Sequence, residues 1–297
     1  MKFNKIATYF FILWLMPTYA NAVYIYDLNG PPSAFLIKRE GQKLHKIGPL
    51  KPLQVGDKIT VRKPTHDFEH LPNKDNFITL ALDDGRLKTL TYADTQEKPY
   101  SVPTTVVDSP NLVDGIMNSF SISFNRLWKN HIQAIQLYTQ DGNDKIIPLS
   151  MRLFKGNNAK LLAGNRALHL AWYDGKPPYQ VRISSMADQT VIWNQKTQTT
   201  EIHFEKQQIA VGRYQVVVTD SQGAKVTGEF TAVTEALPLS PEIEQSRLPE
   251  LSKKTLQAAW LAKEGGWHFE AYQQVTKITG YYPAQLVKLG LERGKRP

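Results

Sequence analysis

Residues 167–185 read ALHLAWYDGKPPYQVRISS, and residues 212–220 read GRYQVVVTD. In both stretches apolar residues alternate with polar ones, as expected for β-strands that bury one face. The residues expected on the buried faces of three such strands are Leu168, Leu170, Trp172, Tyr179, Val181, Ile183, Tyr214, Val216 and Val218. Short strands of this kind, separated by turn residues, predict a β-sandwich.

Further runs extend this prediction over residues 131–236. The strands expected there are Ile132–Thr139, Lys145–Leu149, Ala167–Trp172, Tyr179–Ser184, Thr190–Trp193, Glu201–Phe204, Arg213–Thr219 and Val226–Val233. The phrases LAW at 170–172, PYQV at 178–181 and GRYQV at 212–216 resemble bacterial immunoglobulin-like domains over about residues 165–235. The resemblance implies a tyrosine corner at Gly212-x-Tyr214. It implies little about function, because such sandwiches serve many roles.

A second, smaller β module is expected over residues 23–100. Its alternating runs are Val23–Asp27, Ala34–Lys38, Lys43–Ile47, Lys58–Arg62, Phe77–Leu82 and Leu87–Tyr92. Asp83-Asp84-Gly85 predicts a tight hairpin between the last two runs. In the phrase LQVGDKI at 53–59, Gly56 can take a positive φ before a strand, and Asp57 can accept hydrogen bonds from nearby backbone amides.

This module resembles FecR-type extracytoplasmic domains over about residues 40–92. The matching residues are Leu53, Gly56, Asp57, Ile59, Phe77, Thr79, Leu80, Leu82, Asp84, Gly85 and Leu87. The resemblance implies a periplasmic β module used for protein contact or signal transfer. FecR-type regulators also carry an anti-sigma segment and a membrane span, and this sequence shows neither. We therefore do not expect direct control of a sigma factor.

Residues 1–22, MKFNKIATYFFILWLMPTYANA, have the pattern of a secretory signal peptide cleaved after Ala22. Lys2 and Lys5 precede an apolar stretch too short for a stable membrane anchor, and Ala20 and Ala22 provide the small residues before the cut. The expected destination is the periplasm of a bacterium. The 297 residues include no cysteine, which excludes disulfides, thiolate nucleophiles and cysteine-ligated metals.

Two helical segments complete the expected architecture, which is mainly β. A connecting amphipathic helix is expected over residues 109–130, and residues 237–251 are a proline-rich linker. Residues 252–297 are expected to form a tail of short helices, with Ser252 capping the first and Pro283 opening the third. The tail holds eight basic and three acidic residues, a net charge of +5 out of +9 for the whole chain.

That charge suggests contact with anionic lipid or wall polymer through residues 252–297; a solubilising role is the alternative. An exported protein is not expected to bind nucleic acid. Because apolar positions in the tail are few, we expect its deletion to leave the β core folded. In the alternative, Trp260, Trp267 and Phe269 make the tail a structural clasp across the two β modules.

One motif carries possible metal chemistry. His66-Asp67-Phe68-Glu69-His70 matches H-x-x-E-H, which on a helix can bind zinc through two histidines with the glutamate as base. Pro64 and Pro72 leave room for barely two turns, so a solvated polar loop is the preferred interpretation. No catalytic, cofactor-binding or metal-binding residue is assigned, and no Gly-x-Ser-x-Gly elbow, P-loop or dinucleotide fingerprint occurs.

These features predict a non-catalytic periplasmic binding or scaffold protein of an envelope assembly, which acts through β-sheet surfaces and its basic tail on an envelope or membrane protein partner. One alternative is an accessory sensor subunit of a membrane signalling protein. The other is a zinc-dependent hydrolase that uses His66, Glu69 and His70.

Overall fold

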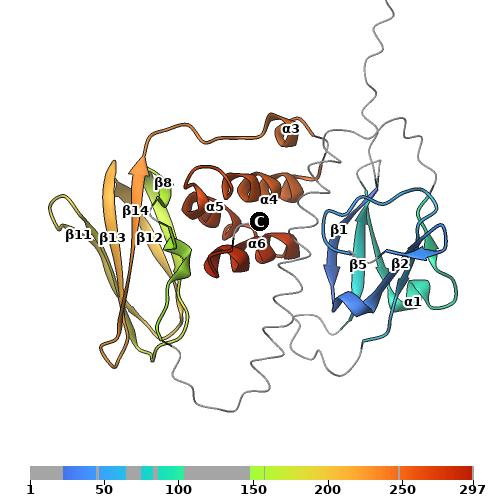
Figure 1. Cartoon of the computed structure of the whole chain (residues 1–297), viewed down its shortest axis with the longest axis horizontal. Coiled ribbons are helices and arrows are strands. Elements are labelled where there is room, and N and C mark those ends of the chain that lie inside the picture. The colour runs from blue at the N-terminus through green and yellow to red at the C-terminus, as the bar shows by residue number, and fades with distance from the viewer. Residues whose placement is uncertain are drawn as a thin grey trace, which may run out of the picture.

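The computed structural model describes residues 23–44, 47–64, 75–82, 86–103, 148–156, 158–246 and 248–295. The signal peptide, the hairpin turn at residues 83–85, the connecting helix at 109–130 and the H-x-x-E-H motif at 66–70 lie outside these ranges. Figure 1 shows the described elements as a β module, a group of short helices and a β-sandwich. The fold is mainly β, as predicted.

The N-terminal module contains two antiparallel sheets. One has the order β1-β5-β6 and the other the order β3-β2-β4-β7. The strands are β1 (Tyr24–Asn29), β2 (Phe35–Arg39), β3 (Gln42–Lys43), β4 (Lys58–Val61), β5 (Phe77–Ala81), β6 (Leu87–Thr91) and β7 (Tyr100–Ser101), with short helices η1 (Pro32–Ala34) and α1 (Tyr92–Thr95). β5 and β6 pair antiparallel, as the predicted hairpin requires.

The predicted turn before β4 is confirmed. Gly56 has a φ of +81°, and the Asp57 carboxylate accepts a hydrogen bond from the Gln54 backbone N–H at 2.9 Å. Asp57 is fully buried, and Arg39 donates to both of its oxygens at 2.9 and 2.8 Å. A buried carboxylate needs such partners because burial removes its water shell. The conspicuous Gly-Asp phrase is therefore structural.

The sandwich has a five-stranded sheet of order β11-β10-β13-β14-β8 and a two-stranded sheet of order β12-β9. Its elements are η3 (Arg152–Phe154), β8 (Lys160–Leu162), β9 (Gly164–Ala171), β10 (Tyr179–Ser185), β11 (Val191–Thr197), β12 (Glu201–Ile209), β13 (Gly212–Thr219) and β14 (Lys225–Val233). β8 pairs parallel to β14, and the other pairs are antiparallel. The nine residues predicted on the inner faces are all buried.

The predicted tyrosine corner is also confirmed. The Tyr214 hydroxyl donates to the backbone carbonyl of Ala210 at 2.8 Å, four residues upstream in the loop before β13. The ring of Tyr214 stacks on Phe230 of β14, with centroids 5.1 Å apart. This link between a strand and the loop before it is typical of immunoglobulin-like sandwiches. The strand order and the corner establish that architecture for the C-terminal β module.

The C-terminal helices are α3 (Pro241–Glu244), α4 (Glu250–Leu261), α5 (His268–Val275) and α6 (Tyr282–Glu292). Pro283 stands at the start of α6, as predicted. Ser252 is not a helix cap, because α4 begins at Glu250 after Pro249. Residues 237–251 are not wholly a linker, since they contain α3 and the first residues of α4.

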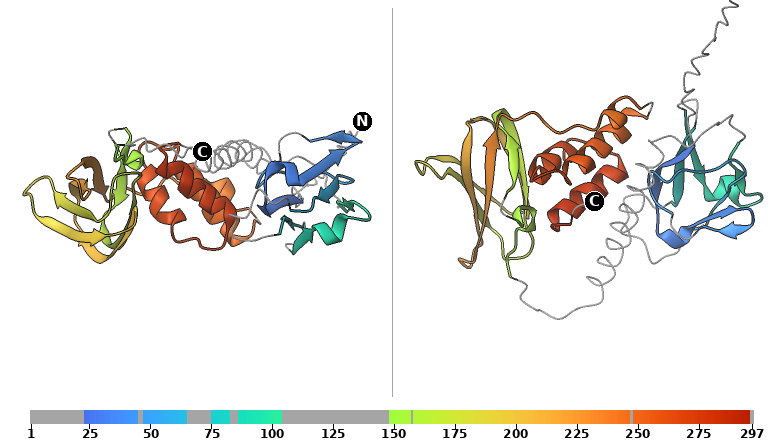
Figure 2. Two further views of the ribbon diagram at one scale, coloured as in Figure 1. Left: turned by 90° about the horizontal axis from the view of Figure 1, so that it is seen from below. Right: turned by 45° about the horizontal axis from the view of Figure 1, so that its top comes forward.

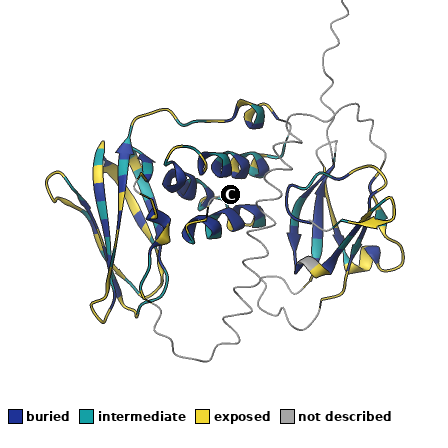
Figure 3. Ribbon diagram, viewed as in Figure 1, coloured by how far each residue is buried: buried dark blue, intermediate teal, exposed yellow. Residues whose placement is uncertain are grey.

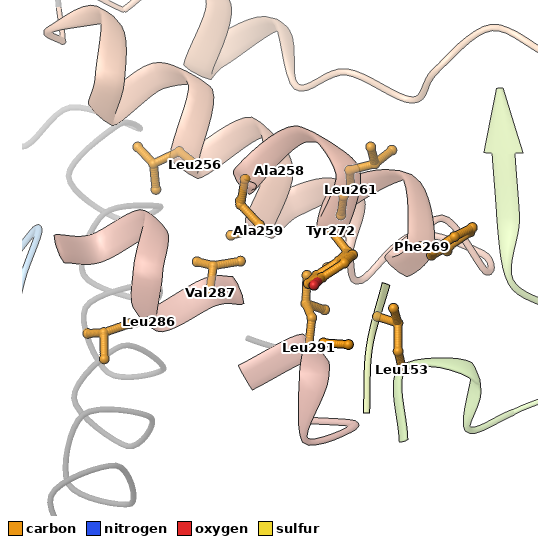
Figure 4. Packing of buried hydrophobic residues seen from close by; sticks show 14 of the residues in the cluster. Leu153, Leu256, Ala258, Ala259, Leu261, Phe269, Tyr272, Leu286, Val287 and Leu291 are labelled. Carbon is orange, nitrogen blue, oxygen red and sulfur yellow. The ribbon is translucent and has the colours of Figure 1, made fainter. Parts of the chain in front are cut away.

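The structure contradicts the premise that the tail has few apolar positions and stands apart from the β core. Both views in Figure 2 place the helices between the N-terminal module and the sandwich. Figure 4 shows Leu261, Tyr272 and Leu291 of the helices converging, with Leu153 of η3 beside them. Trp267 and Phe269 are buried, and Trp260 is half-buried against the same apolar cluster. The helices therefore clasp the two β modules, as the alternative held.

Phe269 shows why the sandwich needs this helix. The two-stranded sheet is narrower than the five-stranded sheet that it faces, so part of the inner face of β14 is left to other elements. Phe269 of α5 packs on Phe230 with centroids 5.1 Å apart and on Phe154 of η3 at 4.8 Å. A Cβ at Gly228 of β14 would collide with the Phe154 ring. Helix α5 and η3 thus complete the second layer.

We predict that Phe269→Ala lowers the free energy of unfolding by about 3–5 kcal/mol, because it opens a cavity in this layer. Urea unfolding followed by tryptophan fluorescence measures the effect. Leu239→Ala is the control, since Leu239 is 48% exposed and its loss should change stability by less than about 0.5 kcal/mol. Equal stability of the two variants would show that α5 is not part of the sandwich core.

Candidate functional site

Helix α5 also closes the open edge of β9. The Gln273 side chain accepts from the backbone N–H of His169 and donates to its carbonyl, both at 2.9 Å. The Gln273 side chain thus bonds both the N–H and the C=O of His169, the groups that a neighbouring strand would otherwise bond. Glu270 accepts from the Leu162 backbone N–H at 3.0 Å and from both terminal nitrogens of Arg166, at 2.7 and 3.1 Å.

This edge contact fixes the position of two histidines. In the β9–β12 register, His169 lies directly opposite His203. The backbone groups of His169 point to Gln273, away from β12, so the two histidines form a non-hydrogen-bonded antiparallel pair. Such pairs bring side chains closest together. The imidazole centroids are 4.2 Å apart, and His169 Nε2 lies 2.8 Å from His203 Nδ1.

The electrostatic surroundings keep this pair from becoming doubly charged. Burial, followed by the neighbouring His203 ring and the Lys288 ammonium, lowers the pKa of His169 to about 4. At neutral pH His169 is therefore uncharged, and one imidazole donates to the other. His203 is exposed and His169 is half-buried.

A carboxylate and lysine network lies next to the histidines. Lys288 of α6 contacts Glu201 at 3.1 Å and Glu292 at 3.2 Å. Glu292 is buried and accepts hydrogen bonds from the Tyr272 hydroxyl at 3.0 Å and the Tyr173 hydroxyl at 3.2 Å. Burial lowers the pKa of Lys288, but Glu292 and Glu201 outweigh it and keep that pKa above its ordinary value. The network ties α6 to β12 and to the loop after β9.

A second polar site joins the helices to β1. The Ser252 hydroxyl lies 2.9 Å from the Tyr281 hydroxyl and 3.4 Å from the Tyr24 hydroxyl. The Tyr26 and Tyr281 rings are in contact, with centroids 4.8 Å apart. Ser252, expected as a cap, is thus a buried link between the N-terminal module and the helices.

Asp27 of β1 completes this joint. Its carboxylate accepts hydrogen bonds from its neighbour Leu28 and from the backbone N–H of Tyr282, the first residue of α6. Backbone N–H groups at the start of a helix have no acceptor within that helix, and here a strand residue from another module accepts from one of them. Burial raises the pKa of Asp27 to about 7, and the two backbone hydrogen bonds only partly offset that rise.

We predict that this joint weakens as the pH rises. Because the pKa of Asp27 is raised on folding, its contribution to stability is full below about pH 4 and is lost as the pH rises through about 7. The loss between pH 5 and pH 8 is roughly 2–3 kcal/mol. Melting temperatures of the protein and of Asp27→Asn at both pH values measure it.

Asp27→Asn keeps an oxygen acceptor but carries no charge. The variant should match the unchanged protein at pH 5 and melt several degrees higher at pH 8. A variant that melts lower than the unchanged protein at pH 8 would contradict the raised pKa.

The third feature is the outer face of the five-stranded sheet. Its strands alternate buried and exposed residues in Figure 3. In Figure 1 β11 and β13 lie away from the helices, while β8, at the other edge of this sheet, lies beside α5. Arg182, Lys196 and Lys225 point outward by register and are exposed. Within the described ranges, no carboxylate oxygen lies within 4.0 Å of these three cations. The two other cations on this face pair with acids, Arg213 with Glu229 and Lys160 with Glu235.

The tail carries less free charge than its composition suggests. Lys288 is engaged by two carboxylates, Lys254 contacts Glu250 at 3.4 Å, and Lys253 donates to the Glu244 carbonyl. Among the residues with described placement, no three histidine, aspartate or glutamate side chains are grouped so as to hold a metal ion. In the same residues, no helix is long and apolar enough to cross a membrane.

Comparisons with known proteins add little beyond the fold. No protein-family model matches the chain, and no curated protein matches it. The FecR resemblance therefore stays a prediction. Among solved structures, the chain is similar to a DUF3244 family protein with an immunoglobulin-like β-sandwich from Bacteroides vulgatus, at 20% identity and a TM-score of 0.20. That similarity covers 22% of this chain and 76% of the other.

Two further structures show comparable similarity. CopC from Methylosinus trichosporium OB3b is 23% identical over 28% of this chain and 91% of its own length, with a TM-score of 0.21. The ZIG-8 IG1 homodimer is 10% identical over 35% of this chain and 97% of its own, with a TM-score of 0.20. The assignment of an immunoglobulin-like sandwich rests on this protein's own strand order and tyrosine corner.

Proposed function

We propose that the protein is a non-catalytic binding or scaffold protein of the bacterial cell envelope, which holds an anionic partner on the outer face of its five-stranded sheet. The observation that carries the proposal is the set of three exposed, unpaired cations on that face, Arg182, Lys196 and Lys225. They stand among neutral polar residues of neighbouring strands, including Asn194, Gln180, Thr219 and Thr227. Such a surface favours an acidic protein partner through complementary charge.

The clasp supports a scaffold role. The helices bond to both β modules through buried polar contacts, at Tyr24–Ser252–Tyr281 on one side and at Arg166–Glu270 on the other. Relative motion of the modules would break these contacts and expose the apolar residues packed around them. A partner bound to the sandwich would therefore be held at a fixed position relative to the N-terminal module.

We predict that photo-crosslinking in the native cell captures a partner on this face. With p-benzoylphenylalanine at Asn194 or Thr227, an envelope-fraction adduct of one defined mass should form. The combined variant Arg182→Glu, Lys196→Glu and Lys225→Glu should abolish it, because like charges repel the partner. The control position is Glu205, which is exposed on β12 of the other sheet.

An adduct of equal yield from Glu205, or one that survives the charge reversal, would contradict the assignment of this face. Binding to vesicles rich in phosphatidylglycerol tests the membrane alternative. If Lys253→Glu with Lys277→Glu in the tail abolishes envelope association and the reversed sheet face does not, the tail is the contact instead.

Export is part of the proposal and has its own prediction. Mass spectrometry of the protein recovered from its native cell should find Val23 as the first residue. Val23 is buried, and its carbonyl accepts from the Leu53 backbone N–H at 2.8 Å, so the residue expected to follow the cleavage site is part of the N-terminal module. Recovery of the chain in the membrane fraction with residues 1–22 attached would argue for an anchored protein.

A further inference from the structure

We propose that His169 and His203 form a binding site for a single divalent transition-metal ion, with Cu²⁺ the preferred ion. The site is built from two imidazoles on adjacent strands, and water would fill the remaining positions. Imidazole nitrogen is a common ligand of copper, nickel and zinc, and Cu²⁺ stands highest among these in affinity for nitrogen donors.

The separation of the nitrogens suits this chemistry. His169 Nε2 and His203 Nδ1 are 2.8 Å apart. A metal ion about 2.0 Å from each nitrogen would hold them at an angle of about 90°. That angle fits neighbouring positions in a square-planar or tetragonal site, the geometry of Cu²⁺, whereas a tetrahedral zinc site needs the nitrogens farther apart.

The two histidines are held close together by hydrogen bonds and by strand pairing. Gln273 fixes the backbone of His169, and the pairing of β9 with β12 fixes His203, so the two nitrogens are close before any ion arrives. Preorganised donors lower the cost of binding. The hydrogen now shared between the rings need only move to the other nitrogen of its own ring.

The surrounding charges nearly balance. Glu201 lies two residues before His203 on the same face of β12, and its carboxylate holds Lys288 at 3.1 Å. Lys288 and Lys277 act unfavourably on positive charge at His169, while Glu201 acts favourably. Because Lys288 is itself held by Glu201 and Glu292, its repulsion of an incoming ion is reduced.

The test uses purified protein without a polyhistidine tag, titrated with CuSO₄ against a competing chelator of known affinity. We expect one equivalent of Cu²⁺ to bind. His203→Thr should weaken binding at least 10-fold, and Thr suits an exposed strand position. The matched control is His66→Ala with His70→Ala, which removes the H-x-x-E-H motif and should leave this binding unchanged.

A second measurement does not depend on the variants folding. In NMR spectra of the unchanged protein, one equivalent of paramagnetic Cu²⁺ should broaden amide signals around residues 169 and 203 before any others. Copper binding that persists in His203→Thr, or broadening centred elsewhere, would overturn the proposal. So would the absence of stoichiometric binding at micromolar Cu²⁺.

Discussion

The architecture depends on how helix α5 completes an unfinished sandwich. A two-stranded sheet cannot cover the five strands opposite it, and β9 has an open edge. Phe269 fills the uncovered part of the inner face, while Glu270 and Gln273 bond the backbone of β8 and β9. Three residues within one and a half turns thus combine apolar and polar contacts to both sheets of the sandwich. Leaving either the face or the edge unmatched would expose apolar surface or strand backbone.

The same helix gives the two histidines their arrangement. Gln273 bonds the His169 backbone groups that point away from β12, and the side chains of His169 and His203 meet across the narrow type of antiparallel pair. Lys288 and Glu292 of α6 then place compensating charges beside them. The histidine pair therefore arises from tertiary packing, and changes in α5 should disturb it as much as changes in the strands.

Sequence alone predicted what alternation and turn chemistry control. The inner faces of the sandwich strands, the Tyr214 corner and the Gly56-Asp57 turn each depend on residues close together in the chain. It could not predict the pairing of His169 with His203, because that needs the register of strands 34 residues apart. It also misjudged Ser252 and Phe269. A short amphipathic helix shows which of its faces is apolar but not which surface covers that face, and here that surface comes from β-strands.

The joint between β1 and α6 has a consequence for the order of folding. Tyr24 and Ser252 are 228 positions apart in the chain. Tyr281, which contacts Ser252 and Tyr26, is synthesised later still. Contacts of such long separation form slowly and require the intervening chain to be present. A growing or truncated chain that ends before residue 281 would leave the apolar side of β1 uncovered. The native state thus forms only after residue 281 has been synthesised, and chains that end before it remain exposed to proteases and chaperones.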